Sequence, residues 1–423
     1  MIDPQQQPQP WVGTLKRLVF CGGVMLCAVV SPACQGNDDL CVGAVAMSDQ
    51  CGMPLTKEEC KALSSDDAHK LQAALEEMNC SVGNSNDPPS AETCKLAGWP
   101  CPAAIGPEPD TGNAPQYQVV FVSGIDGQAA FDWNPALLGA VAATTGAKVV
   151  HATLPSWTST NERASALWST LLDHGAGNDG VKFNLICYAV GGLDCRTLAS
   201  ANGLFSSDPD TYRIVQSSIA SITTISTPHH GTRVADASVI ALETGTQSDL
   251  IESVTGLNVP TSIASGALLD SLRAITLDAA SRRSATLTDG DGIYYQSFAG
   301  VSHVAGDASA PSAASVNAAC VDSAGNISIT GGADLVDVMQ PQLWITAPLG
   351  GASEDDSGNV SVSPTDGMVA VESAKWGTFR GCIPADHYHV IGQLHRSSRD
   401  VMTGFDVGRF YSWLVGDLAG RGF

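Results

Sequence analysis

Apolar segments typical of buried strands alternate with helix-like segments along the chain from residue 117 onward. This alternation predicts βαβ units and a mostly parallel sheet covered by helices. In such a sheet ligands bind beyond the carboxyl ends of the strands, so function is expected in the loops after Val122, Ile186 and Ser226. The predicted strands are Tyr117–Val122, Lys148–Leu154, Val181–Ile186, Ser221–Ser226 and Ile293–Phe298, and the predicted helices include Pro135–Thr145 and Asn161–Asp173.

The third predicted strand runs directly into a glycine-containing turn and another helix, in the segment Asn184–Arg196 (NLICYAVGGLDCR). A buried strand, a sharp turn and a helix form the nucleophile elbow, usually G-x-S-x-G, in which small residues flank a strained nucleophile. Gly191 keeps the second glycine position, Cys187 stands at the first, and Ala189 stands at the nucleophile position. Because alanine has no group that attacks a carbonyl carbon, the elbow lacks its nucleophile.

Six sequence blocks, in a common order, resemble bacterial secreted triacylglycerol lipases of the α/β-hydrolase superfamily over about residues 115–415. Each block is weak alone, and the shared order makes the resemblance specific. The blocks are VVFVSGI at 119–125, GGLD with Arg196 at 191–196, TTISTPHHG at 223–231, YYQSFAG at 294–300, TDGMV at 365–369 followed by SAKWG at 373–377, and ADHY at 385–388 followed by IGQ at 391–393.

The resemblance implies an α/β-hydrolase fold over residues 117–423, with a lid or cap insertion, and a lipid or other acyl ester as the substrate class. Matched onto this sequence, the family's catalytic acid and base fall on Asp366 and His387, where the carboxylate would orient the imidazole and the imidazole would move protons. The order elbow, Asp, His is that of α/β-hydrolases. The oxyanion hole would be the backbone N–H groups of Ile125 and Val190, because it needs the fold and no particular side chain.

The alanine at the elbow leaves three hypotheses open: a relocated nucleophile, a natural loss of the serine, and an engineered Ser→Ala replacement. Ser123, Thr224 and Ser226 lie at strand ends that the elbow does not serve. Cys187 lies two residues from the tip, so its side chain should point away from His387. A designed replacement would leave the neighbours untouched, whereas Ser123, Cys187 and Tyr188 also depart from the family pattern. These departures favour a natural, catalytically impaired protein.

Related lipases often hold a structural calcium ion near the catalytic histidine, with an aspartate two residues after it. This chain has His389 at that position, and calcium prefers oxygen ligands. Two histidines, His387 and His389, are too few for another metal. The sequence therefore predicts no cofactor and no metal.

The resemblance also bears on two regions outside the elbow. Residues 232–290 would be the lid over an acyl pocket, although an ordinary packed cap helix explains their apolar stripe equally well. Cys320 and Cys382 would form a disulfide beside the His387 segment. Residues 307–331 are rich in Ala, Ser and Gly and are predicted to be a surface loop.

Six of the 13 cysteines lie close together, at positions 41, 51, 60, 80, 94 and 101. This density predicts a disulfide-stapled module over residues 34–105 and an oxidising compartment. The pairing stays open, because six cysteines allow 15 connectivities. A zinc module is the alternative, but no C-x-x-C pair is present. Helices are expected after Thr56, which begins a capping box, and after Ser65; residues 106–116 are a Pro- and Gly-containing linker.

The N-terminus has the pattern of an export signal. A basic pair at 16–17 precedes Leu18–Val30, which carries no charge and is too short for a membrane span but suits a signal-peptide core. The small residues at 31 and 33 suit ordinary cleavage, so residues 1–33 are predicted to be a signal peptide. Cys34 directly afterwards resembles a lipobox cysteine, although Ser31 stands where leucine is usual, so cleavage without lipidation and lipidation of Cys34 both stay open.

The charge of the chain excludes several partners. With 21 basic and 43 acidic residues the net charge is −22, which opposes unassisted binding to nucleic acid or to an anionic membrane. Membrane contact is therefore expected only through an apolar surface or a lipid on Cys34. The sequence predicts an exported, impaired lipase-like hydrolase; the alternatives are an active esterase with another nucleophile, a lipid- or acyl-binding protein, and an envelope component tethered through Cys34.

Overall fold

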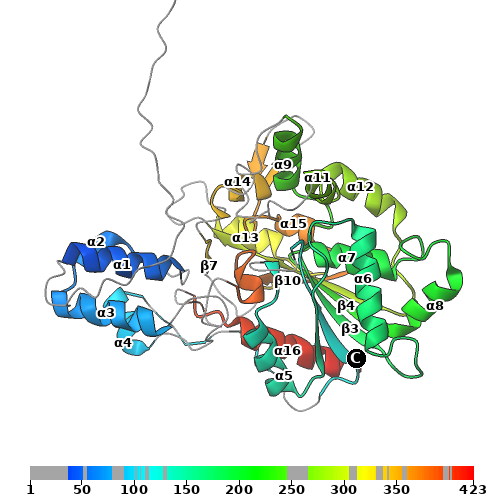
Figure 1. Ribbon diagram of the computed structural model, residues 1–423, viewed down its shortest axis with the longest axis horizontal. Coiled ribbons are helices and arrows are strands. Elements are labelled where there is room, and N and C mark those ends of the chain that lie inside the picture. Colours follow the sequence, from blue (N-terminus) through cyan, green and yellow to red (C-terminus); the bar gives the residue numbers. More distant parts are fainter. Residues whose placement is uncertain are drawn as a thin grey trace, which may run out of the picture.

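The computed structural model describes residues 37–50, 55–78, 90–99, 101, 103–104, 106–109, 114–126, 131–244, 265–303, 312–329, 337–340, 343–354, 360–393, 400 and 403–423. The predicted signal peptide, the lipidation candidate Cys34, and both Cys51 and Cys80 lie outside these residues. A small helical part at the N-terminal side and a larger α/β part are visible in Figure 1.

A six-stranded sheet forms the centre of the larger part, and its strands follow the order β10-β5-β4-β3-β1-β2 with every neighbouring pair parallel. The five predicted strands are present, each within two residues of its predicted ends, whereas β10 was not predicted. The strands are β1 Gln118–Val122, β2 Val149–Ala152, β3 Phe183–Tyr188, β4 Ile219–Ile225, β5 Tyr294–Gly300 and β10 Thr378–Ile383.

Helices cover both faces of this sheet, and each face has its own apolar core. Because successive strand residues point to opposite faces, Val119 and Phe121 of β1 join one core while Val120 and Val122 join the other. Strands covered on both sides are apolar throughout, and every residue of β3 is buried. On the first face lie α5 Pro135–Thr145 and α16 Val407–Gly420, and on the second lie α6 Thr160–Asp173, α7 Val190–Ala199 and α8 Pro209–Ser218 (Figure 1).

The parallel sheet, its two helical layers and the strand–turn–helix at β3 confirm the predicted α/β-hydrolase fold class. The helix predicted at Pro135–Thr145 has those bounds, and α6 begins one residue before its predicted start. The start of α6 is fixed by a capping box between Ser159 and Glu162.

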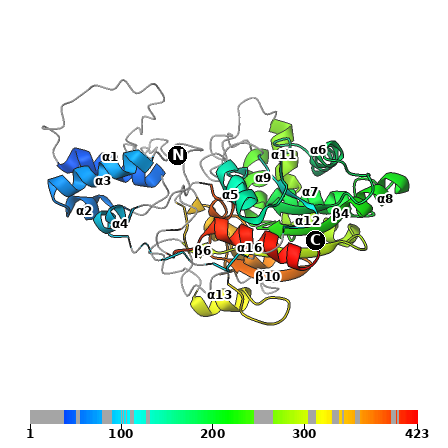
Figure 2. The same ribbon diagram turned by 90° about the horizontal axis from the view of Figure 1, so that it is seen from below.

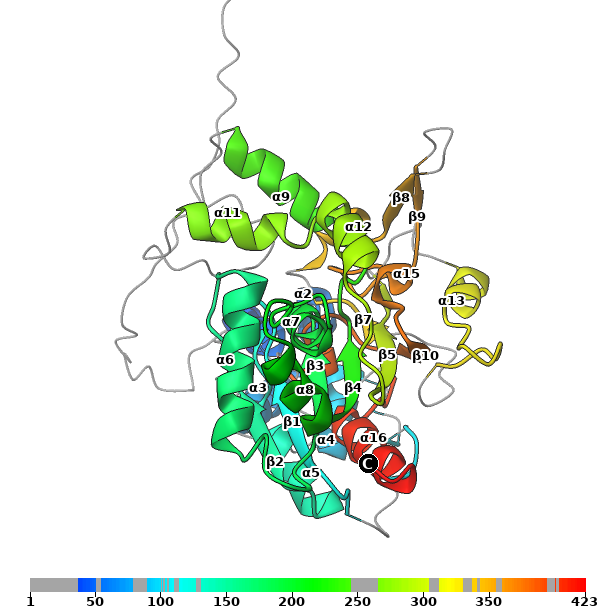
Figure 3. The ribbon, with the colours of Figure 1, turned by 90° about the vertical axis from the view of Figure 1, so that its right-hand side faces the viewer.

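Between β4 and β5 the described residues form α9 Arg233–Glu243, α11 Ser265–Arg273 and α12 Leu277–Thr286. They lie together beyond one end of the sheet, on the side where α7 begins (Figure 3). The apolar stripe of the predicted insertion faces inward, because Leu268, Leu272 and Ile275 are buried.

The segment between β5 and β10 carries short elements rather than one long loop. The prediction of a surface loop at residues 307–331 is wrong in part, since Ala313–Ala319 forms helix α13 with Val316 and Ala319 buried. The other elements are β6 Ser302–His303, β7 Asp337–Val338, α14 Ala347–Gly350, β8 Ala352–Glu354, β9 Val360–Val362 and α15 Val371–Ala374.

The described residues of the cysteine-rich part form helices that lie side by side in Figure 2. The capping box at Thr56 starts α2 as predicted, and Leu71 and Leu75 of the predicted second helix are buried in a separate small core. Disulfides join Cys41 to Cys60 and Cys94 to Cys101. The helices are α1 Asn37–Gln50, α2 Lys57–Lys61, α3 Ser65–Met78 and α4 Ala91–Ala97, of which α1 and α4 were not predicted.

After this module, Arg409 of α16 and a backbone hydrogen bond from Gln116 to the carbonyl oxygen of Phe423 tie the chain to the larger part. Arg409 of α16 donates to the carbonyl oxygens of Ala104 and Pro107 and pairs with Glu108. No helix within the described ranges is both long enough and apolar enough to cross a bilayer.

Candidate active site

The elbow predicted at the end of β3 is present, and Ala189 stands at its tip. Its backbone has φ 47° and ψ −123°, a conformation that L-residues rarely adopt. Two glycines after the tip are required by close packing: a Cβ on Gly191 would lie 2.3 Å from the carbonyl oxygen of Ser123, and a Cβ on Gly192 would lie 2.1 Å from Oγ1 of Thr227. The sequence therefore folds into an elbow whose geometry does not depend on a serine.

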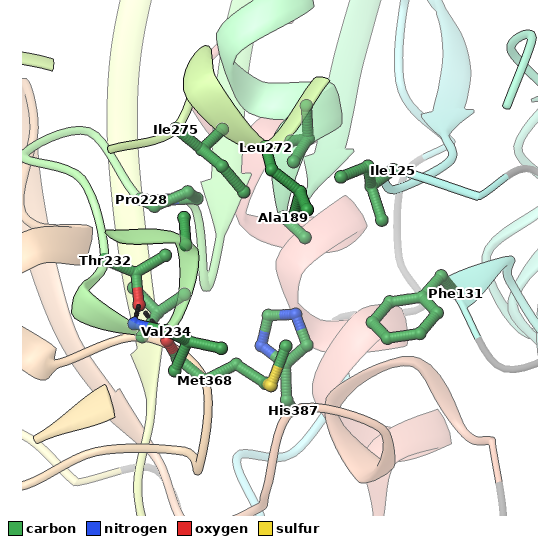
Figure 4. Close-up of a pocket in the computed structure, with 13 residues that line it drawn as sticks. Ile125, Phe131, Ala189, Pro228, Thr232, Val234, Leu272, Ile275, Met368 and His387 are labelled. Atoms are coloured by element: carbon green, nitrogen blue, oxygen red, sulfur yellow. Dashed lines mark hydrogen bonds between the residues drawn. The ribbon is translucent and has the colours of Figure 1, made fainter. Parts of the chain in front are cut away.

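Asp366 and His387 lie together beside this tip. Oδ2 of Asp366 is 2.7 Å from Nδ1 of His387, and both side chains are buried. Oδ1 of the same carboxylate accepts the N–H groups of Met368 and Val369 at 3.0 and 2.8 Å, which orients the group and leaves Oδ2 for the imidazole. Nε2 of His387 has no hydrogen-bond partner among the described residues, and the ring faces the pocket next to Ala189 (Figure 4).

Tyr188, the residue before the tip, holds the histidine segment from the other side. Its hydroxyl donates to the carbonyl oxygen of His387 at 2.7 Å, and the two rings lie 5.1 Å apart. Burial raises the pKa of Tyr188 well above its ordinary value, with the nearby Asp366 carboxylate adding to the shift. The tyrosine is therefore a neutral donor that fixes the histidine backbone.

The N–H groups of Ile125 and Val190 are the predicted oxyanion hole, and both residues line the pocket beside Ala189. Neither N–H group has a hydrogen-bond partner among the described residues. Val190 is the first residue of α7, so its N–H group has no partner within the helix and lies at the positive end of the helix dipole.

Arg163 of α6 orients the loop that carries Ile125. Its guanidinium, only 1% exposed, donates to the carbonyl oxygens of Ser123, Gly124 and Ile125. In a trans peptide the C=O and the following N–H point in opposite directions. Because the carbonyl oxygen of Gly124 points to Arg163, the N–H group of Ile125 points away from the guanidinium.

The same arginine is tied to the elbow helix through Asp194 of α7. Nε of Arg163 lies 2.7 Å from Oδ2 of this fully buried carboxylate. Burial raises the pKa of Asp194 to about 6, and the attraction of Arg163 offsets only part of that shift. This pair was not predicted from the sequence. The available signal was an arginine four residues before Leu167, on the inward face of α6.

The pocket at the elbow is apolar apart from His387 and Thr232 and has a volume of about 470 Å³, part of it open to solvent. Leu272 and Ile275 from the insertion form one wall, so this part of residues 232–290 covers the pocket as the resemblance implied (Figure 4). The full lining is Ile125, Phe131, Ala189, Val190, Pro228, Thr232, Val234, Ala235, Leu272, Ile275, Met368, Val369 and His387.

Each group considered as a relocated nucleophile is engaged elsewhere. Cys187 forms a disulfide with Cys195, which links β3 to α7 behind the tip and was not predicted from the sequence. Oγ of Ser123 accepts the N–H group of Leu154. In the same way Thr224 is bonded to the His229 ring, and Ser226 accepts the N–H group of Gly300. None of these groups bonds His387.

The predicted pair of Cys320 and Cys382 is joined by a disulfide that links the end of α13 to β10. β10 leads directly to the His387 segment, so this disulfide anchors the chain close to the site.

His389, which stands at the family's calcium position, is buried, and burial lowers its pKa to about 4, with Asp400 opposing the shift. Its backbone N–H group donates to Asp386, whose carboxylate also accepts the N–H groups of Gln340 and Tyr388. Within the part of the chain that the structure describes, no three His, Cys, Asp or Glu side chains come together as metal ligands do.

The strand order, the elbow and the adjacent Asp–His pair define a lipase-like α/β-hydrolase fold. Solved structures similar to this chain include the mature lipase BlEst2 from Bacillus licheniformis, at 16% identity and TM-score 0.43, covering 74% of this chain and 94% of that one. EstA from Clostridium botulinum is 16% identical with TM-score 0.47, covering 82% and 98%. The Staphylococcus hyicus lipase is 15% identical with TM-score 0.42, covering 74% and 99%. No family model and no curated protein matches the sequence.

Proposed function

We propose that this chain is an exported, lipase-like protein that binds a lipid or another acyl compound and hydrolyses esters poorly or not at all. The observation that carries the proposal is Ala189 at the tip of an otherwise complete elbow. The Asp366–His387 pair and the N–H groups of Ile125 and Val190 border a mostly apolar pocket. Among the described residues that line it, the only hydroxyl is that of Thr232, which donates to the carbonyl oxygen of Met368.

The missing nucleophile determines the expected loss of turnover. A lipase forms a serine ester and then hydrolyses it, and this chain cannot take the first step at Ala189. In serine hydrolases stripped of a triad member, the oxyanion hole and binding alone retain about 10³–10⁴-fold acceleration over water. Such a remnant is far below the turnover of a working lipase.

An active esterase with another nucleophile is the competing function. The nearest candidates are in a disulfide, as Cys187 is, or accept hydrogen bonds from the backbone, as Ser123 and Ser226 do. This engagement supports loss of turnover over relocation of the nucleophile.

The test compares the unaltered chain with Ala189→Ser and with the double variant Ala189→Ser, Asp366→Asn. Short- and long-chain p-nitrophenyl esters measure turnover, and a fluorescent phosphonate labels an activated serine. We expect labelling and at least a 10³-fold rise in turnover for the single variant Ala189→Ser. The double variant should show neither, because Asp366→Asn removes the group that orients His387. Rapid turnover by the unaltered chain would overturn the proposal.

The export part of the proposal rests on the signal-like N-terminus and on four disulfides, which persist in oxidising compartments. Expression with radiolabelled palmitate would distinguish an anchor on Cys34, which Cys34→Ala would abolish, from simple cleavage after residue 33.

A further inference from the structure

Two arginine side chains, on α7 and α12, each have a buried nitrogen atom without a protein partner. These atoms are Nε of Arg196 and Nη1 of Arg283, and neither is hydrogen-bonded to any described residue. Arg196 is only 8% exposed, and its guanidinium lies over the ring of Trp376, 5.3 Å from the ring centroid. Buried polar groups are normally hydrogen-bonded, and buried charges are normally paired, so these two side chains are exceptions.

Contacts at both ends of α12 place this helix against α7 and the loop that precedes the insertion. Near the C-terminal end of both helices, Nδ2 of Asn202 donates to the carbonyl oxygen of Thr286 at 3.2 Å. At the start of α12, a Cβ on Gly231 would lie only 2.7 Å from the helix backbone. Arg283 lies three residues before Thr286, and Arg196 lies three residues before the end of α7. Both arginines are therefore about one helical turn from the same junction.

The charges of the two guanidiniums agree with this placement. Burial lowers the pKa of Arg283 to about 10, and repulsion by Arg196 adds to the shift. Burial also lowers the pKa of Arg196, although both side chains stay cationic near pH 7. The same two charges act on the fully buried His229, whose pKa burial already lowers, so that ring stays neutral. Two like charges therefore face each other at the junction of α7 and α12.

The carboxylates nearby do not balance these charges. Asp194 attracts Arg283, but its Oδ2 is paired with Arg163 and its buried Oδ1 has no hydrogen-bond partner among the described residues. Asp289, whose charge acts on Arg196, is exposed to solvent and forms no ion pair with any described residue. Three guanidiniums therefore share one buried carboxylate, and a further negative charge is needed.

We infer that a small inorganic anion, of the size and charge of chloride, binds between α7 and α12 on Nε of Arg196 and Nη1 of Arg283. A water molecule could accept both N–H groups but would leave the two positive charges unbalanced, whereas an anion satisfies both needs. Each guanidinium contributes one buried N–H group, which suits a spherical ion better than a flat carboxylate that takes two from one arginine. The inference goes beyond the proposed function and does not depend on it.

The bound anion would fasten the insertion to the helix that begins at the elbow. Nη2 of Arg283 donates to the carbonyl oxygen of Ala274, which lies between the pocket-wall residues Leu272 and Ile275. An anion shared with Arg196 would hold this guanidinium, and through it the wall, against α7. Without the anion, repulsion between the two guanidiniums would push α12 away from the elbow helix.

The experiment measures thermal unfolding of the full chain while sodium gluconate is replaced by sodium chloride or sodium bromide at a constant sodium concentration of about 200 mM. Gluconate is too large for the site, so the exchange changes the anion and leaves the ionic strength unchanged. We expect the melting temperature to rise by about 3 °C and to level off as the halide saturates one site. An unchanged melting temperature would overturn the inference.

Matched variants separate the site from a general effect of salt. Arg196→Met and Arg283→Met should each abolish the difference between halide and gluconate, whereas Arg282→Met, at the exposed neighbouring arginine of α12, should keep it. An equal halide effect in all four proteins would overturn the inference. Crystals of the unaltered chain grown in bromide give a readout that does not depend on how the variants fold. An anomalous peak between the guanidiniums of Arg196 and Arg283 would support the inference, and its absence would overturn it.

Discussion

Replacing Arg163 by methionine tests how the oxyanion loop is held. The guanidinium is buried between α6, α7 and the loop after β1, and it donates to Asp194 and to four carbonyl oxygens, those of Ser123, Gly124, Ile125 and Pro155. Methionine keeps much of the volume and none of the donors. The change therefore leaves one buried carboxylate and the carbonyl oxygens of Ser123, Gly124 and Pro155 without this partner, whereas that of Ile125 keeps the N–H group of Trp157.

Two contributions determine how much free energy of unfolding Arg163→Met loses. Removing one partner of a buried ion pair costs about 3–5 kcal/mol. The pKa of Asp194 is already raised from 3.8 to about 6, which corresponds to about 3 kcal/mol of unfavourable ionisation at neutral pH, and losing Arg163 raises it further. An acid whose pKa is higher in the folded state destabilises the fold as pH rises through that pKa. The deficit of Arg163→Met should therefore be larger at pH 8 than at pH 5.

Urea unfolding followed by near-ultraviolet circular dichroism at pH 5, 6.5 and 8 measures this deficit. Arg163→Met with Asp194→Leu is the matched control, because it removes the buried charge together with its partner. We expect the control to recover part of the lost free energy of unfolding and to show no pH dependence of the deficit. Its free energy of unfolding should stay below that of the unaltered chain, because the carbonyl oxygens still lack a donor. A deficit under about 1 kcal/mol, or one independent of pH, would show that Arg163 does not hold the oxyanion loop through a buried ion pair with Asp194.

Three further changes have outcomes that thermal unfolding can check. Gly191→Ala places a methyl group 2.3 Å from a backbone oxygen and should prevent folding of the elbow, whereas Gly139→Ala, in α5 with no atom within 4 Å, should stabilise by up to about 1 kcal/mol. A raised melting temperature for the first would contradict the packing argument. Replacing Cys187 and Cys195 together by alanine should cost about 2–3 kcal/mol, the value for so short a loop, and an unchanged melting temperature in non-reducing buffer would show that the bond does not form.

The fold was predictable where local pattern and burial agree. β3 is buried on both faces, and its sequence is mostly apolar. The start of α6 is marked in the sequence by a capping box at Ser159. The edge strand β10 was missed because Thr378 and Arg380 are not buried and a glycine interrupts the run. Helix α13 was missed because its Ala- and Ser-rich sequence has little amphipathic pattern, and the burial of Val316 and Ala319 comes only from tertiary packing.

The candidate site was predictable only at positions that a motif fixes. The elbow tip and the pair Asp366 and His387 follow from blocks in a known order, and the structure brings the three residues together. The bridge from Arg163 to the oxyanion loop has no local signature, because it joins residues about 40 positions apart. The Cys187–Cys195 disulfide depends on where the elbow directs β3 and α7, which spacing alone does not determine.

The backbone of the elbow stays strained although its nucleophile is absent. The backbone groups that would bind an acyl group therefore do not depend on the side chain that would attack it. The conformation of Ala189 costs about 1–3 kcal/mol and persists because its surroundings enforce it. Its N–H group donates to Ile225 at 2.9 Å, and its carbonyl oxygen accepts the N–H group of Gly192. These contacts involve only main-chain atoms, so the donor at Val190 keeps its place whatever side chain stands at the tip. An acyl group can therefore be recognised by the same N–H groups that would stabilise an oxyanion, and a single hydroxyl at position 189 is the smallest change that would couple recognition to turnover.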